Sequence, residues 1–403
     1  MKKSYLLFIL STILISEVWA RPEYAVREKT NCINCHVSPY GAGHRRVFGK
    51  VYGSREMSEA KTSDNDLYYA DVRAVEYLRA MNSNKEVRGG LGLMMAEAGV
   101  KVDIFESSEE EGRSFDTSLV LSHDFGSFAA GTRNVYIMAS KVESLEPINS
   151  MLFGRFYSPF GLMTDEHRTY TKMVSDSKYN KDFVMGFMLS GNFTEAFHYD
   201  VALTNGLKAG GFVEEDQESV GSIVNMRWNP KSMPFMLGTS LKYIHIDDAE
   251  ADASKVQHSP YAGSFYSIFD LYNLTNGSVP LSIQGEFVQA HNYNDSSTSD
   301  SMTMLASGAY LDGIKRSISN SYVILMKYDL NNQWKLIAKY DHLYLNKDHE
   351  LDYHELFGLG VRYQFNANMN VQFRLENAKV TRSDLEGIHS GFDDFFIVFR
   401  AWI

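Results

Sequence analysis

Apolar and polar residues alternate at period two over most of the chain after about residue 66. The pattern is clearest at positions 197–204, 279–287, 334–341 and 369–376. Successive side chains of an extended strand point to opposite faces, so each of these segments has one apolar and one polar face. The alternation predicts a β-sheet protein with many strands.

The connections between these segments are of two kinds. Turn-like connections fall at 330–332 and 366–368, and long polar ones fall at 107–113, 209–219, 247–255, 293–301 and 381–390. Short turns at one end and long loops at the other are typical of outer-membrane barrels, whose interfacial girdles suit the 13% aromatic content. At roughly 20 residues per strand and connection, we predict an all-β fold: a transmembrane antiparallel β-barrel of about 16 strands.

A soluble β-sandwich or propeller also alternates, but its inward face is apolar. Arg374 and Glu376 alternate with apolar neighbours and fit a polar lumen better than a packed core. The final strand, 395–403, resembles the terminal strand of outer-membrane barrels, which normally closes on an aromatic residue. Here Trp402 is penultimate and Ile403 is last. These features favour the barrel.

The first twenty residues have the features of a secretory signal peptide. Lys2 and Lys3 precede an apolar run from Tyr5 to Ile15, and Val18-Trp19-Ala20 offers a cleavage site. No later segment has the roughly 18 consecutive apolar residues that a membrane helix needs. We therefore predict a signal peptide at 1–20, a small N-terminal segment at 21–66 and an outer-membrane barrel at 67–403.

Charge is divided unevenly between these parts. The chain has 39 basic and 50 acidic residues, an acidic balance that argues against nucleic acid as a partner. The stretch 21–55 is nevertheless basic, with Arg21, Arg27, Lys29, Arg45, Arg46, Lys50 and Arg55 against Glu23 and Glu28. A basic N-terminal segment would sit well as a plug in an acidic lumen.

Both cysteines of the chain fall in one motif, Cys32-Ile33-Asn34-Cys35-His36. C-x-x-C-H is the attachment signature of haem c: the two thiols form thioethers with the porphyrin, and His36 follows as the proximal iron ligand. Export supports this interpretation, because attachment takes place outside the cytoplasm. We predict one covalent haem c on Cys32, Cys35 and His36.

Three other uses of the motif compete with haem. A redox-active dithiol normally occurs in a thioredoxin-like βαβ context, which this chain lacks. A zinc site would need further ligands, and the sequence has no second cysteine pair. A disulfide spanning two residues would be strained.

The residues that follow the motif suit a small haem-binding fold. After the turn at 39–43, a short helix is predicted from apolar residues at helical spacing, namely Val47, Phe48, Val51 and Tyr52. Arg45, Arg46 and Lys50 either pair with the haem propionates or form a solvated basic face. The sixth iron ligand stays open between His44, Met57, another residue and none.

The combination of motif and barrel resembles the fused monohaem cytochrome–porins of the outer membrane, whose members are associated with ferrous iron oxidation. The likeness rests on 32–36, Pro39, the 43–53 stretch with Phe48, and a barrel filling the rest of the chain. It implies electron transfer between an extracellular donor or acceptor, such as Fe(II), and a periplasmic c-type cytochrome or similar carrier. The 154–162 stretch also resembles phosphate-selective-type porins.

Three functions follow as hypotheses. The first is an electron conduit across the outer membrane, with ferrous iron oxidoreductase as its enzyme activity. The second is a substrate porin whose haem is structural, sensory or gating, and the third is a soluble periplasmic cytochrome fused to a β-domain.

Two acidic clusters, Glu109–Glu111 and Glu214–Asp216, are candidate cation-attracting loops or simply solvated ones. His167, His245, His291 and His342 are expected to be lumen or girdle residues rather than metal ligands.

Overall fold

The structure is a computed structural model that describes residues 22–40, 45–46, 49, 67–81, 87–106, 115–126, 131–141, 147–164, 166, 169–175, 183–206, 218–247, 259–291, 318–344, 353–366, 369–381 and 389–402.

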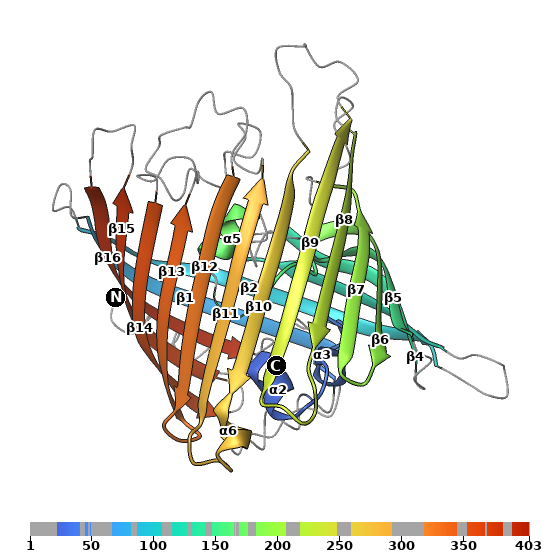
Figure 1. The fold of residues 1–403 in the computed structure, drawn as a ribbon, viewed down its shortest axis with the longest axis horizontal. Coiled ribbons are helices and arrows are strands. Elements are labelled where there is room, and N and C mark those ends of the chain that lie inside the picture. The colour runs from blue at the N-terminus through green and yellow to red at the C-terminus, as the bar shows by residue number, and fades with distance from the viewer. Residues whose placement is uncertain are drawn as a thin grey trace, which may run out of the picture.

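Within these residues, sixteen antiparallel strands form one closed barrel, in agreement with the predicted fold and strand number (Figure 1). The strands are β1 (Tyr68–Met81), β2 (Val87–Phe105), β3 (Phe115–Asp124), β4 (Gly131–Lys141), β5 (Ile148–Tyr157), β6 (Phe183–Thr194), β7 (Phe197–Thr204), β8 (Glu218–Trp228), β9 (Phe235–Asp247), β10 (Tyr261–Asp270), β11 (Leu281–His291), β12 (Ile318–Asp329), β13 (Trp334–Tyr344), β14 (Tyr353–Asn366), β15 (Met369–Thr381) and β16 (His389–Trp402). Each pairs with its sequence neighbours, and β16 pairs with β1. Closure leaves no strand edge with unpaired backbone groups, which is the condition for a sheet to cross a bilayer.

The strands turn their polar face inward and their apolar face outward, the reverse of the arrangement in a soluble sandwich. Along β13, Lys335, Lys339 and Asp341 are buried toward the lumen, whereas Trp334 and Leu336 are exposed on the outside. The same order recurs in β7 and β11. In these strands polar side chains face the lumen and apolar ones face outward, and together with the closed strand order this excludes the sandwich and propeller interpretations.

Aromatic contacts lie near both ends of the outer face. Trp228, Phe235 and Phe269 meet near one end, where Trp334 also contacts Tyr363. Near the other end, Tyr261 stacks on His291, and Tyr322, Tyr344 and Tyr353 surround His342. These two sets correspond to the predicted interfacial girdles.

The described residues contain no helix that is long and apolar enough to cross a membrane.

The strand order separates a turn end from a loop end. At the turn end, two residues join β6 to β7 and four join β12 to β13. The long connections after β5, β7, β9 and β11 are at the opposite end. One prediction was wrong: 107–113 joins β2 to β3, and these strands meet at the turn end. The two acidic clusters, 109–111 and 214–216, lie outside the described residues.

Among the described residues there are four short helices: α2 (Pro22–Arg27), α3 (Cys32–Cys35), α5 (Tyr170–Val174) and α6 (Leu271–Leu274). Helix α6 lies in the turn between β10 and β11. Helices α2 and α3 lie near that same end inside the barrel, and α5 lies higher, against β11, β12 and β13 (Figure 1). The described parts of the N-terminal segment and of the 158–175 loop thus both lie in the lumen.

Candidate functional site

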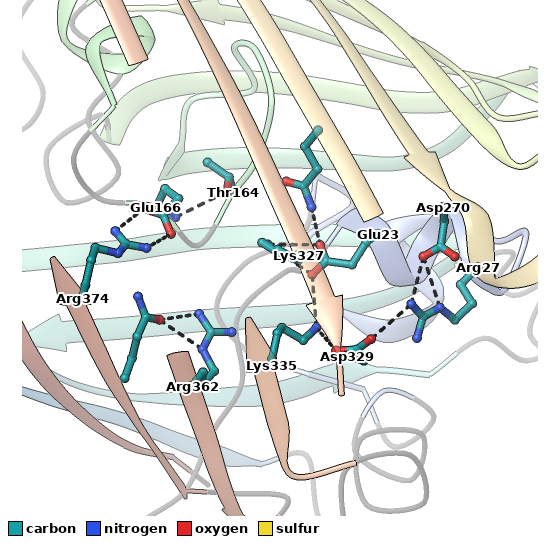
Figure 2. Close-up of polar contacts among 12 residues, drawn as sticks. Glu23, Arg27, Thr164, Glu166, Asp270, Lys327, Asp329, Lys335, Arg362 and Arg374 are labelled. Atoms are coloured by element: carbon teal, nitrogen blue, oxygen red, sulfur yellow. Dashed lines mark hydrogen bonds and ion pairs between the residues drawn. The ribbon is translucent and has the colours of Figure 1, made fainter. Parts of the chain in front are cut away.

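The N-terminal segment is held to the barrel wall by a buried carboxylate, Glu23. Its side chain is fully buried, Lys327 Nζ lies 3.2 Å from its Oε1, and Gln284 Nε2 donates to its Oε2 at 2.7 Å. Lys335 Nζ lies 4.0 Å from the same Oε1 (Figure 2). A buried charge is tolerated only when it is paired and hydrogen-bonded. The contacts of Glu23 therefore fix α2 at one position against β11–β13.

A second ion-pair group, of opposite polarity, lies at the last residue of α2. Arg27 Nη2 is 3.1 Å from Asp270 Oδ2 and 3.4 Å from Asp329 Oδ2 (Figure 2). Burial alone would lower the pKa of Arg27, but the nearby carboxylates, Asp270 above all, raise it above its ordinary value, so the guanidinium stays charged. Within α2 the acidic residue thus meets lysines and the basic residue meets aspartates, so charges of both signs bind this helix to the wall.

The C-x-x-C-H motif lies in this anchored segment. Cys32 and Cys35 are the first and last residues of α3, so their side chains fall on one helix face, and both are free, half-buried thiols. His36 follows with a buried side chain, and its backbone N–H donates to Cys32 O at 2.8 Å. Two accessible thiols one helical turn apart, followed at once by an imidazole, are the donor set that haem c requires.

The thiol environment bears on the competing interpretations. Burial, together with nearby Cys32, raises the pKa of the Cys35 thiol to about 11. The nucleophile of a C-x-x-C dithiol is the first cysteine, so this shift on the second one does not decide between the dithiol and haem interpretations. Among the described residues, no group of three or more His, Cys, Asp and Glu side chains is placed to hold a metal ion, so zinc gains no support.

The residues after the motif are described only in part. Arg45 is buried, pairs with His36 through a backbone bridge and donates to Gly49 O at 2.9 Å. Arg46 Nε donates to His36 O at 3.1 Å. Arg45 is thus not on a solvated face. The other predictions made there lie outside the described residues: His44 and Met57 as sixth ligands, Lys50, and the helix with Val47, Phe48, Val51 and Tyr52.

Several wall residues that hold the motif were not singled out from the sequence. Arg227 Nη1 donates to Cys32 Sγ at 3.2 Å, and Arg227 Nη2 donates to Asp200 Oδ2 at 2.7 Å. Asn229 Nδ2 lies 3.3 Å from Ala25 O and 3.2 Å from Thr30 O, so it bonds the end of α2 and the turn before α3. In the sequence these residues show only as polar positions on or just after a strand.

The 158–175 loop turns into the lumen and contacts the N-terminal segment. Leu162 N donates to Glu286 Oε1 at 2.7 Å, and Gly161 N donates to Ser240 Oγ at 2.9 Å. From the other side, the hydroxyl of Tyr40 donates to Gly161 O. The loop is therefore fixed between the wall and the segment that carries the motif.

Replacing Gly161 by alanine is expected to destabilise the protein by roughly 1–3 kcal/mol, because its backbone is left-handed and an added Cβ has no room. Gly161 has φ +71°, and its Cβ would lie 2.1 Å from Glu286 Oε1. That carboxylate also accepts from Ser264 Oγ at 2.9 Å, so it cannot easily move. Loss of heat-modifiable gel migration at a lower temperature would report the change. Gly263→Ala is the control, since its Cβ would meet only Leu241 Cδ2, at 3.6 Å.

Farther along the same loop, Glu166 is bound by Arg374 on β15. Arg374 donates to both carboxylate oxygens of Glu166, and its Nη1 is 3.2 Å from Glu376 Oε1 (Figure 2). Tyr170 N donates to Asp341 Oδ2 at 2.9 Å. The expectation that Arg374 and Glu376 face a polar lumen is confirmed, and their contacts include this loop.

The histidines singled out from the sequence do not form a site. His245 and His291 face outward, and His342 lies among outer-face tyrosines with Glu355 at 3.7 Å. His167 lies outside the described residues. The buried histidine near the motif is instead His198, whose ring nitrogens meet Asn192 Oδ1 at 2.7 Å and Asp200 Oδ1 at 3.2 Å.

No family model and no curated protein matches the sequence. Solved structures match over nearly their whole length. The anion-selective porin of Comamonas acidovorans has a TM-score of 0.55 at 10% identity, over 83% of this chain and 98% of that one. The fold is that of outer-membrane porins. The outer-membrane channel DcaP of Acinetobacter baumannii gives 0.57 at 10% identity over 85% and 99%. OmpF of Salmonella typhi, in a complex with daunomycin, gives 0.58 at 9% over 83% and 97%.

The fold and the apolar outer face agree with the outer-membrane location predicted from the sequence. At such low identity the likeness extends to the fold and not to the solute that passes through the barrel.

Proposed function

We propose that the protein is a porin-type passage for small polar solutes across the outer membrane, whose turn-end mouth holds its own N-terminal segment. The observation that carries this proposal is the way that segment is bound: Glu23 and Arg27 are ion-paired with lumen-facing or turn-end residues of a barrel in which many buried, inward side chains are polar or charged. The lumen offers hydrogen-bonding groups to a polar solute, and the apolar outer face contacts the outer-membrane lipid.

We further propose that the segment carries haem c, with Cys32 and Cys35 as the thioether residues and His36 as the axial ligand. The group would supply a one-electron couple inside the lumen. The chain's own part is positional: the α2 ion pairs and the Arg227–Cys32 hydrogen bond hold the motif at one place on the wall. This haem would be structural, sensory or gating in a solute passage.

A second function, electron transfer, is favoured by where the motif lies. Short turns face the periplasm in outer-membrane barrels, so the motif is on the side that a periplasmic c-type cytochrome or similar carrier can approach. A hydrocarbon core of about 30 Å is far wider than one haem, so the other redox partner has to enter the lumen from the loop side. By the family resemblance, Fe(II) is a candidate donor.

Two measurements on the detergent-purified, full-length protein test these functions. We expect stepwise conductance in planar bilayers, and a larger conductance for a variant lacking residues 22–66. Sharp α and β bands of haem c on reduction are expected as well. Absence of conductance together with prompt reduction by Fe(II) under nitrogen would replace the passage by electron transfer as the main function. Bands that need dithionite would remove Fe(II) as donor, and absence of haem would refute the cofactor assignment.

A further inference from the structure

A buried pair of opposite charges touches the first cysteine of the motif. Arg227 on β8 donates to Cys32 Sγ at 3.2 Å through Nη1 and to Asp200 Oδ2 on β7 at 2.7 Å through Nη2. Asp200 is fully buried, and Arg227 is 7% exposed. The pair lies beside the motif, on strands other than those whose residues bind Glu23 and Arg27.

The position of this pair is fixed from several directions. Asp200 also accepts from Ser190 Oγ at 2.6 Å, from Asn225 Nδ2 at 3.2 Å and from His198 Nε2 at 3.2 Å. The guanidinium of Arg227 lies 5.4 Å from the centre of the Tyr40 ring. Neither charge can turn away from Cys32 without breaking these contacts.

We propose that Arg227 and Asp200 tune the reduction potential of the haem through fixed opposite charges at the edge attached to Cys32. The proposal rests on the haem assignment made above. In the haem-bound protein a thioether would join Cys32 Sγ to the haem, so the cation that is hydrogen-bonded to this sulfur would be close to the group. The reduced form carries one electron more than the oxidised form, so a nearby cation favours reduction and a nearby anion opposes it. Burial strengthens both effects, because the local dielectric is low.

The test is a spectroelectrochemical titration of the full-length protein carrying Asp200→Asn or Arg227→Gln. Asp200→Asn leaves the cation without its counter-charge and is expected to shift the potential in the positive direction. Arg227→Gln leaves the anion and is expected to shift it in the negative direction. Glu195→Gln is the matched control, because Glu195 is 76% exposed and paired with exposed Lys231 at the same end of the barrel. Its shift is expected to be much smaller.

Potential shifts of opposite sign in the two single variants are the decisive result, because a merely structural loss would shift both potentials in the same direction. Equal signs, or shifts no larger than that of Glu195→Gln, would overturn the proposal. Arg227→Lys and the double variant Asp200→Asn/Arg227→Gln keep the test open if a single variant folds poorly. Both preserve the net charge and are expected to stay near the wild-type potential; a large shift in either would contradict the charge mechanism. Lack of haem in the wild type would instead refute the proposed cofactor.

Discussion

Replacing Cys32 and Cys35 together by serine is expected to abolish covalent haem and to leave the barrel folded. Haem c stays on the chain through denaturing electrophoresis only because of its thioethers, and this chain has two cysteines. Both thiols are half-buried and free, so serine in their place takes away no disulfide. Peroxidase staining of the denatured band should fall from full intensity to none, while heat-modifiable migration persists.

The single variants and a spacer control sharpen this result. Cys32→Ser and Cys35→Ser each leave one thiol for attachment, so stained haem with a shifted α band is expected. Asn34→Ala changes the spacer of the motif and should keep both thioethers. Covalent haem in the double serine variant would mean that another residue holds the group. Wild-type protein with a folded barrel, two titratable thiols and no haem would contradict the assignment altogether.

Several strands could be predicted from the sequence because apolar and polar residues alternate clearly in them, as in 334–341. Which face points inward could not be predicted from one strand, since the pattern reads equally well with either face buried. Closure decides it: only a barrel in lipid puts Lys339 inside and Leu336 outside. The end of the barrel at which a connection lies depends on the number of strands that precede it. Loop length alone therefore assigned 107–113 to the wrong end.

The C-x-x-C-H motif is visible in the sequence because its residues are adjacent, whereas the wall residues that contact it could not be predicted. Arg227 contacts Cys32 across 195 sequence positions, and nothing local distinguishes it from other inward polar residues. Glu23 and Lys327 are likewise joined only by the fold. The loop that carries Gly161 has no periodicity, so its course through the lumen had no pattern to predict it.

Glu23→Gln is expected to release the N-terminal segment from the wall and speed tryptic cleavage after Arg27 by roughly two to four orders of magnitude. The substitution removes the carboxylate from buried Lys327, whose Nζ lies 3.2 Å from Glu23 Oε1. Breaking a buried ion pair on one side costs about 3–5 kcal/mol, and here that cost weakens docking of α2. Cleavage follows the population of the undocked segment when docking is fast compared with proteolysis. Mass spectrometry of time points in detergent would measure the rate.

The same change in an exposed pair provides the control for this experiment. Glu195 and Lys231 lie 2.6 Å apart at the turn end, but both are largely exposed, so water screens them and Glu195→Gln should leave cleavage after Arg27 unchanged. Glu23→Gln/Lys327→Gln removes both buried charges and is expected to be cleaved more slowly than Glu23→Gln alone, because no lysine is then left without its carboxylate. If Glu23→Gln were cleaved no faster than Glu195→Gln, Glu23 would not be the residue that holds the segment in the lumen.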